Sequence, residues 1–315
     1  MKGWQDIKKE IEDGKSPDKP AGDFDGVRRA KYALVSALTK RPLVVYATAF
    51  QNPIKAQFAG AFLSIDLSDK DGFHEVTRNL KGTAVDVFIH SPGGSAEATE
   101  SIVKILRNKF KDVRFIVTGT AKSAATMMIM SGNSILMDSN AELGPVDPQV
   151  RVRGRFSPAG SIIEQFDRAS KTLAKNPDQL PVWIPILQEF APALLVECEN
   201  YIKLSKKLVS TWLAEYMFVG EKRAKHRASI VARFLANEKN SLSHARRIDL
   251  AQLQNINCGL KIKPIHDESL ELQDALGQLH LSIMATLDGT GAVKLFENSE
   301  GEALIRSVGI QQNPQ

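Results

Sequence analysis

Cysteine is scarce in this chain of 315 residues, which contains only Cys198 and Cys258. One pair of thiols is too few for a disulfide framework, so we expect both as buried side chains in a reducing compartment. Long apolar runs are also lacking, because the longest, residues 124–137, is interrupted by the polar and glycine residues 131–134. It falls short of the roughly 20 residues that cross a bilayer. We therefore expect a cytoplasmic protein without a membrane span.

An excess of charge of one sign is lacking too, since 41 Lys and Arg against 36 Asp and Glu leave a net charge of +5. The densest basic stretch, residues 221–227, has no interleaved aromatic residues and matches no nucleic-acid module. We interpret it as a solvated helix face and do not expect nucleic acid as a partner. The 6 histidines show no spacing typical of metal ligands, so neither a metal nor a cofactor is expected.

Short apolar runs do alternate with helical patterns through the first half of the chain. The runs that predict buried strands are residues 43–47, 61–65, 85–89, 115–117 and 134–137. Because helices are predicted between them, the sequence indicates an α/β layered fold with mostly parallel strands. In such folds, catalytic groups collect at the carboxyl ends of the strands.

The composition divides the chain into five parts. We expect a flexible N-terminal arm over 1–26, an α/β core over 27–155, a helical insertion over 156–237, a closing segment with a C-terminal helix over 238–300, and a flexible tail over 301–315. The arm lacks the apolar stretch of a signal peptide.

Two tight turns of small residues follow neighbouring strands. The glycines of the turn at residues 91–95 allow backbone N–H groups to hold an oxyanion or an extended peptide, although a plain turn uses the same residues. In the second turn, Ser123 opens a helix beside Ala124, which leaves its hydroxyl accessible, and a plain N-cap is the alternative. No Gly-x-Ser-x-Gly motif surrounds it, so the elbow of α/β-hydrolases is not predicted.

These turns resemble the serine dehydrogenase proteinase (SDH) family of Clp-fold serine proteinases, in the ClpP/crotonase superfamily. The similarity lies in residues 89–95, 118–126 and 140–149, and extends to 182–187 and 294–298. It implies an α/β fold with a ClpP/crotonase-like core of repeated β-β-α units and additional C-terminal helices.

By the same resemblance, Ser123 is the nucleophile of a serine peptidase that forms an acyl-enzyme. The N–H groups of Gly93 or Gly94 and of Ala124 receive the oxyanion. A peptide or protein is the implied substrate, and a homo-oligomer is implied, with contacts formed by the helices of 156–237.

The general base is not assigned by the resemblance. Clp peptidases carry a histidine soon after the strand matching 135–137, whereas residues 143–148 contain none. Asp147 is a candidate base or orienting residue, with a turn role before Pro148 as the other interpretation. Signal-peptide-peptidase relatives use a lysine from a later segment, and the corresponding region here contains Glu164, Lys171 and Lys175. None of the three is aligned by the resemblance, and Lys171 is taken as the candidate base.

Two further side chains are not expected to act as the general base. Lys122 is adjacent to Ser123, so its side chain is expected to project away from the hydroxyl. His244 is interpreted as a surface or capping histidine. Because the base is missing, a catalytically inactive Clp-like scaffold that binds peptides stays an alternative, as does a crotonase-type acyl-CoA enzyme, which uses a similar pair of backbone donors.

Overall fold

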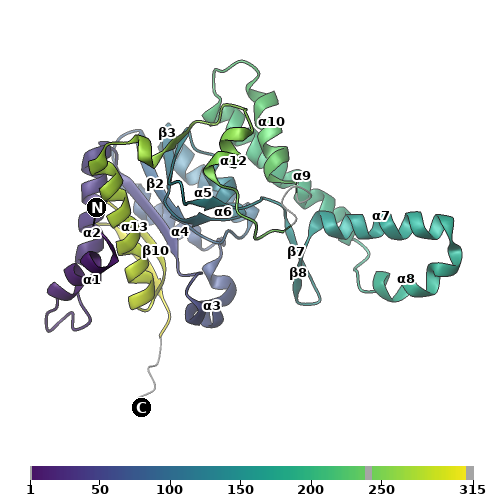
Figure 1. Ribbon diagram of the computed structural model, residues 1–315, viewed down its shortest axis with the longest axis horizontal. Coiled ribbons are helices and arrows are strands. Elements are labelled where there is room, and N and C mark those ends of the chain that lie inside the picture. Colours follow the sequence, from purple (N-terminus) through teal and green to yellow (C-terminus); the bar gives the residue numbers. More distant parts are fainter. Residues whose placement is uncertain (1, 238–242, 310–315) are drawn as a thin grey trace, which may run out of the picture.

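The computed structural model describes residues 2–237 and 243–309, and its centre is a seven-stranded mixed sheet (Figure 1). The parallel strands are β1 (Leu43–Thr48), β2 (Ala84–His90), β3 (Asp112–Val117), β5 (Ser134–Met137) and β9 (Ile262–Pro264). Two antiparallel strands, β10 (Ala292–Asn298) and β11 (Ala303–Ser307), extend the sheet beyond β1. This arrangement confirms the predicted α/β fold with mostly parallel strands.

The central strands are buried on both faces, which explains why their sequences are continuous apolar runs. Along β1, the side chains of Val44 and Tyr46 join the core on one face, and those of Leu43 and Val45 join the core on the other. Successive residues of a strand point to opposite faces, so a single short run serves both layers.

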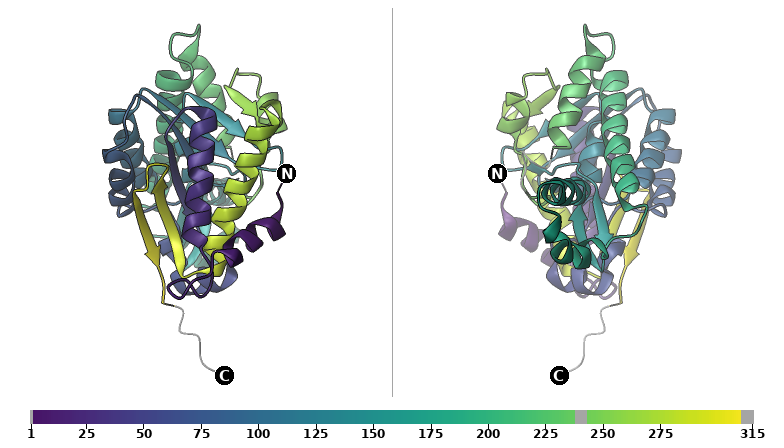
Figure 2. Two further views of the ribbon diagram at one scale, coloured as in Figure 1. Left: turned by 90° about the vertical axis from the view of Figure 1, so that its left-hand side faces the viewer. Right: turned by 90° about the vertical axis from the view of Figure 1, so that its right-hand side faces the viewer.

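Helices cover the two faces of the sheet. One face is covered by α2 (Phe24–Thr39) and α13 (Leu270–Gly289), which lie side by side (Figure 2). The opposite face is covered by α4 (Asp69–Arg78), α5 (Ala96–Lys109), α6 (Ala124–Ile129), α10 (Ala224–Leu235) and the C-terminal part of α9 (Leu194–Trp212). Between these layers lies a continuous apolar core.

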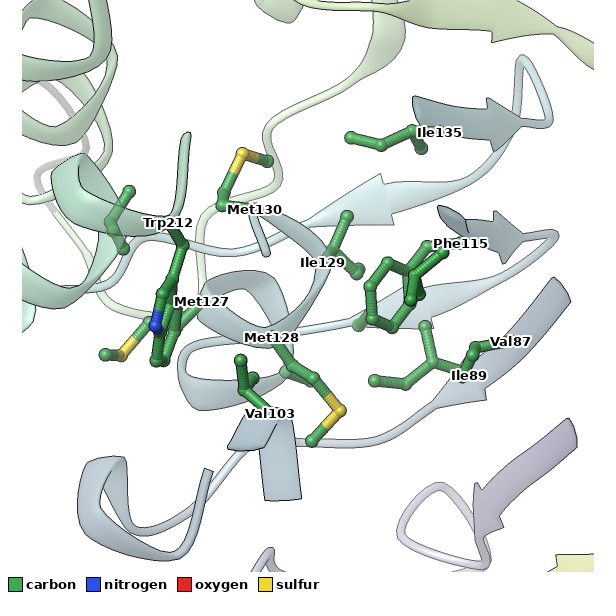
Figure 3. Close-up of a cluster of buried hydrophobic side chains, with 14 of the residues drawn as sticks. Val87, Ile89, Val103, Phe115, Met127, Met128, Ile129, Met130, Ile135 and Trp212 are labelled. Atoms are coloured by element: carbon green, nitrogen blue, oxygen red, sulfur yellow. The ribbon is translucent and has the colours of Figure 1, made fainter. Parts of the chain in front are cut away.

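The helix α6 is entirely buried. Met127, Met128 and Met130 are at most 2% exposed and pack among the sheet, α5 and the indole of Trp212 (Figure 3). These methionines therefore belong to the core and do not line a surface groove.

A projection extends away from the sheet (Figure 1). It is formed by β7 (Gln149–Val152), β8 (Arg155–Pro158), α7 (Ala159–Lys175), η2 (Pro177–Gln179), α8 (Leu180–Leu187) and the start of α9. The remaining short elements are α3 (Pro53–Ala59), η1 (Gly60–Leu63), β4 (Thr120–Ala121), β6 (Glu142–Leu143), η3 (Leu213–Met217), α12 (Leu250–Asn255) and η4 (Ile265–Asp267).

Both ends of the chain contribute ordered elements where flexible segments are predicted. The first helix, α1 (Trp4–Asp13), buries Ile7 and Ile11 against α13, since residues four apart share one helix face. The tail forms β11 on the edge of the sheet, while residues 310–315 lie outside the described part. The prediction of a flexible arm and tail is wrong for these elements.

Two other expectations are corrected. Residues 60–63 form the 3-10 helix η1 where a strand is predicted, and only Ile65 makes an isolated bridge, to Gly94. The core is not limited to residues 27–155, because β9, β10 and β11 complete its sheet. The second half of the helical insertion also packs into that core.

Candidate active site

The Gly-Gly turn lies at the carboxyl end of β2, beside the segment that contains Ile65. Gly93 and Gly94 have φ of +94° and +154°. A β-carbon on Gly94 would lie 2.2 Å from the carbonyl oxygen of Ile65. The turn thus requires glycine both for its backbone conformation and for this close approach. Ser95 then caps α5 by accepting a hydrogen bond from the N–H of Ala98 at 3.0 Å.

Ser123 adopts a strained backbone conformation at the start of α6, with φ of +50° and ψ of −118°. A positive φ is costly for a residue with a side chain and is found mainly where the surrounding structure enforces it, often at active sites. Although Gly-x-Ser-x-Gly is missing, the local geometry is that of a sharp strand-to-helix turn. The Ser123 hydroxyl is half-buried and forms no hydrogen bond with any residue in 2–237 or 243–309.

The two turns meet because β2 and β3 are neighbouring parallel strands. The N–H of Lys122 donates to the Ser91 carbonyl at 3.0 Å. A β-carbon on Gly93 would lie 2.8 Å from the Ser123 β-carbon and 2.9 Å from the amide nitrogen of Ala124. The predicted nucleophile and oxyanion residues therefore come together in one place.

The N–H groups at this point differ in their hydrogen bonds. The amide of Gly93 donates to the Ser91 hydroxyl at 3.2 Å. Within the described parts of the chain, the amides of Gly94 and Ala124 donate to no protein acceptor. These two N–H groups are thus the ones left for a ligand oxygen.

Asp147 is paired with His244, a contact that the sequence interpretation missed. The Asp147 carboxylate is buried and lies 2.9 Å from Nδ1 of His244. Its other oxygen accepts a hydrogen bond from the Gln149 amide at 2.8 Å. The histidine is therefore held by a buried carboxylate and is not merely a surface or capping residue.

Backbone pairing brings this aspartate and histidine together. Leu143 and Ile248 exchange two hydrogen bonds of 2.9 Å in an antiparallel bridge. Continuing that register places residue 147 opposite residue 244. The same segment begins as β6, which runs parallel to β4 just before Ser123, and Asp147 follows four residues after β6 in a stretch without regular secondary structure.

The lysines near the site differ in what they contact. Lys122 forms an ion pair with Glu142, with 2.8 Å between Nζ and the carboxylate oxygen, which occupies its ammonium away from the serine hydroxyl. Lys171 is exposed on α7, and α7 packs on β8, η2, α8 and α9. Among the described residues, no hydrogen bond or ion pair joins Lys171 to Ser123, so its role as base stays a prediction.

A family match covers the part of the chain that contains both turns. Residues 57–188, which are fewer than half of the chain, match the family model of the ClpP-like SDH-type serine proteinases. This match agrees with the resemblance and with the ClpP-like α/β fold predicted from the sequence. The matched family is one of serine proteinases.

Relatives of this chain include two uncharacterized proteins of Methanocaldococcus jannaschii. MJ1495 is 32% identical over 170 residues, which are 49% of this chain and 54% of the relative. MJ0137 is 33% identical over 122 residues, 39% of each protein. The chain thus spans about half the length of these relatives or less.

Similar solved structures include two mutants of the 1510-N membrane-bound stomatin-specific protease, each 15% identical to this chain. One gives a TM-score of 0.32 and covers 64% of this chain and 92% of that one. The other, in complex with a substrate peptide, gives a TM-score of 0.33 and covers 70% and 94%. In the described part of the chain, no helix has the length and apolar character needed to cross a bilayer.

Two histidines lie behind the two turns, of which His90 is buried and His280 is partly buried. His90 is 2% exposed, its ring centroid lies 4.9 Å from that of Phe50, and it faces His280 of α13 at 6.4 Å. Thr118 is hydrogen-bonded to Nδ1 of His280 at 2.9 Å, whereas Nδ1 of His90 has no partner among the described residues. Burial, with a smaller contribution from His280, lowers the pKa of His90 to about 3.

This shift predicts acid sensitivity of the fold. Below pH of about 6.5 the unfolded chain protonates His90, while the folded protein does not until about pH 3. Between these values the free energy of unfolding should fall with falling pH, by about 1.4 kcal/mol per pH unit from this one group. Urea unfolding at pH 7, 6, 5 and 4 would measure it. In His90→Leu, the free energy of unfolding should depend less steeply on pH than in the wild type. Equal slopes in the two proteins would contradict the lowered pKa of His90.

Proposed function

We propose that this protein is a serine peptidase that hydrolyses peptide bonds through an acyl-enzyme on Ser123. The observation that carries the proposal is the strained Ser123, held directly against the Gly93 turn at the start of α6. Strain of this kind persists where the surrounding structure enforces one geometry, which suits a hydroxyl that must be presented to a substrate. The match of residues 57–188 to a family of serine proteinases supports the same conclusion.

Gly94 and Ala124 are the proposed oxyanion donors. Ala124 follows Ser123 in the chain, and Gly94 follows Gly93, which packs against Ser123. Neither N–H group has a protein acceptor in the described structure. A donor aimed at the developing oxyanion typically contributes about 3 kcal/mol to stabilisation of the transition state. Gly93 is not proposed as a donor, because its N–H already donates to the Ser91 hydroxyl. Its lack of a side chain allows Ser123 to pack directly against the turn.

His244 is the proposed general base, with Asp147 as its orienting residue. Because the carboxylate binds Nδ1, Nε2 is the imidazole nitrogen left to accept the Ser123 proton. No hydrogen bond joins Ser123 to His244 in the described structure. Such catalytic hydrogen bonds are often long without substrate and tighten in the complex.

These groups support a complete hydrolytic cycle. Ser123 Oγ attacks the peptide carbonyl carbon, and its proton passes to Nε2 of His244. The carbon–nitrogen bond then breaks as His244 returns the proton to the leaving amine. Water attacks the resulting ester, again giving a proton to His244, and the carboxylic acid leaves as Ser123 regains its hydrogen.

Labelling with a fluorophosphonate tests this function. The reagent should form one covalent adduct, which mass spectrometry of the digested protein should locate on Ser123, and the labelled protein should lose hydrolysis of an unstructured protein substrate. Absence of both labelling and hydrolysis would instead favour an inactive peptide-binding scaffold. Turnover of acyl-CoA thioesters that survives labelling would favour a crotonase-type enzyme.

We also propose that the peptidase is a homo-oligomer, and the scarcity of cysteine supports a cytoplasmic location. The projecting helix α8 consists of apolar residues, yet none is buried. Val182 is 64% exposed and Ile184 is 41% exposed. A contiguous apolar surface of this kind on a soluble domain is typical of a protein interface, and a second copy of the chain is the proposed occupant.

Changing α8 should therefore shift the assembly state. Val182→Asp with Ile184→Asp places two charges on the proposed interface and should weaken self-association at least tenfold. Light scattering after size exclusion would report the mass. Ala174→Asp, on exposed α7, serves as a matched control. An identical mass for all three proteins would refute α8 as the interface.

A further inference from the structure

A lysine and an aspartate are completely buried beneath the segment that supports the Gly-Gly turn. Lys294 of β10 and Asp69 of α4 each have 0% exposure, and 2.7 Å separates the lysine Nζ from the carboxylate. The rings of Tyr46, Phe73 and Phe296 form an aromatic cluster on the same face of the sheet. Burial raises the pKa of the Asp69 carboxyl, and the ammonium of Lys294 opposes that shift.

The pair holds the chain on both sides of Ile65. The Lys294 ammonium also donates to the Ser64 carbonyl at 2.8 Å and contacts the Asp66 carboxylate at 3.3 Å. The second oxygen of Asp69 accepts the Asp66 N–H at 3.3 Å. Because Lys294 Nζ has three acceptors, its side chain is held in one position.

Ile65 in turn holds the Gly-Gly turn through its backbone. Its N–H donates to the Gly93 carbonyl at 2.7 Å, and its carbonyl accepts the Ser95 N–H at 2.9 Å. Gly94 lies between these two hydrogen bonds, packed directly against the Ile65 backbone. The peptide plane that carries the Gly94 N–H is therefore set by the position of Ile65.

We propose that Lys294 and Asp69 are positioning residues for the oxyanion donor Gly94, acting through the backbone of Ile65. This inference rests on the proposed peptidase function. Neither residue touches a substrate or the reacting atoms. Their role is to fix where the Gly94 N–H points, and a small displacement of such a donor weakens its hydrogen bond to the transition state.

The energetics of buried ion pairs favour a positioning role over a purely stabilising one. Removing two charges from water costs so much that apolar replacements of similar shape are often neutral or better for stability. A stable sheet therefore does not require this pair, whereas the oriented contacts to Ser64 and Asp66 cannot be made by apolar side chains.

The chain contains a matched control for this test. Arg28 of α2 and Glu297 of β10 form another buried ion pair, with a distance of 2.6 Å, on the opposite face of the sheet. This second pair contacts Tyr32 and Thr286 and makes no hydrogen bond to residues 64–66 or 93–95 among the described residues. Its loss should disturb the sheet without moving the turn.

The test compares two double variants with the wild type. One combines Lys294→Met and Asp69→Asn, and the other combines Arg28→Met and Glu297→Gln. Both variants keep the approximate side-chain shapes while removing the charges. Thermal melting would verify that each variant is folded. Only the first should lower kcat for a peptide substrate, by about tenfold to a hundredfold, with KM changed less than threefold. Equal losses of kcat in both variants would overturn the proposal.

A second measurement separates this inference from the peptidase function. Hydrogen exchange at the amides of Ile65 and Ser95 should be at least tenfold faster in the Lys294 and Asp69 variant than in the control variant. If the wild type neither hydrolyses peptides nor reacts with a fluorophosphonate, the peptidase function fails. Faster exchange in the Lys294 and Asp69 variant would still show that this pair positions the Gly-Gly turn. Unchanged exchange at both amides overturns the inference, whatever the activity.

Discussion

Replacing Ser123 by alanine is expected to lower kcat for peptide hydrolysis by about 10⁴-fold or more. Removal of the hydroxyl leaves only the backbone donors and substrate binding, which cannot form an acyl-enzyme. Labelling by a fluorophosphonate should disappear as well. The melting temperature should change little, because alanine can be held in the same strained backbone and the hydroxyl makes no hydrogen bond in the described structure.

The matched control is Ser101→Ala, on the outer face of α5. Its hydroxyl donates to the Glu97 carbonyl at 3.1 Å within that helix. This variant should retain wild-type hydrolysis and labelling. Retention of labelling in Ser123→Ala would disprove the nucleophile, whereas hydrolysis that persists without labelling would point to a reaction that does not need a serine.

The second large effect is expected from the paired histidine and aspartate. His244→Ala should lower kcat by on the order of 10³-fold to 10⁴-fold, because serine without a base is a weak nucleophile. Asp147→Asn should have a similar effect, since an amide can donate to Nδ1 and thereby favour the wrong tautomer. Steady-state kinetics with a fluorogenic peptide would measure both.

Two further variants make this result specific. His226→Ala changes an exposed histidine on α10 and should leave kcat as it is. Lys171→Ala compares the two candidate bases directly. A large loss in Lys171→Ala with normal kcat in His244→Ala would transfer the role to the lysine, and would require that it come from a neighbouring subunit.

The strands and turns could be predicted because their signals are local. A run such as residues 85–89 is buried on both faces, so its composition alone indicates a central strand. The Gly93 and Gly94 pair likewise indicates a turn in which a side chain would clash. The meeting of this turn with Ser123 then follows from the adjacency of parallel strands.

The proposed base and its partner could not be predicted because their contact is not local. Asp147 and His244 are 97 residues apart, and their contact depends on the pairing of Leu143 with Ile248. A lone histidine in a polar stretch gives no indication of that register. The burial of Lys294 is hidden for the same reason, since a lysine in a sequence usually indicates a solvated position.

The position of β10 in the sheet has a consequence for biosynthesis. This strand lies between β1 and β11, yet it is translated about 245 residues after β1, whose Val45 pairs with its Glu297. A ribosome adding roughly 5–20 residues per second needs many seconds to cover that distance. Throughout this time, residues 64–66 lack the ammonium of Lys294. On the proposed function, the contacts that position the Gly94 donor therefore cannot form before β10 has emerged from the ribosome, so the nascent chain would be inactive until then.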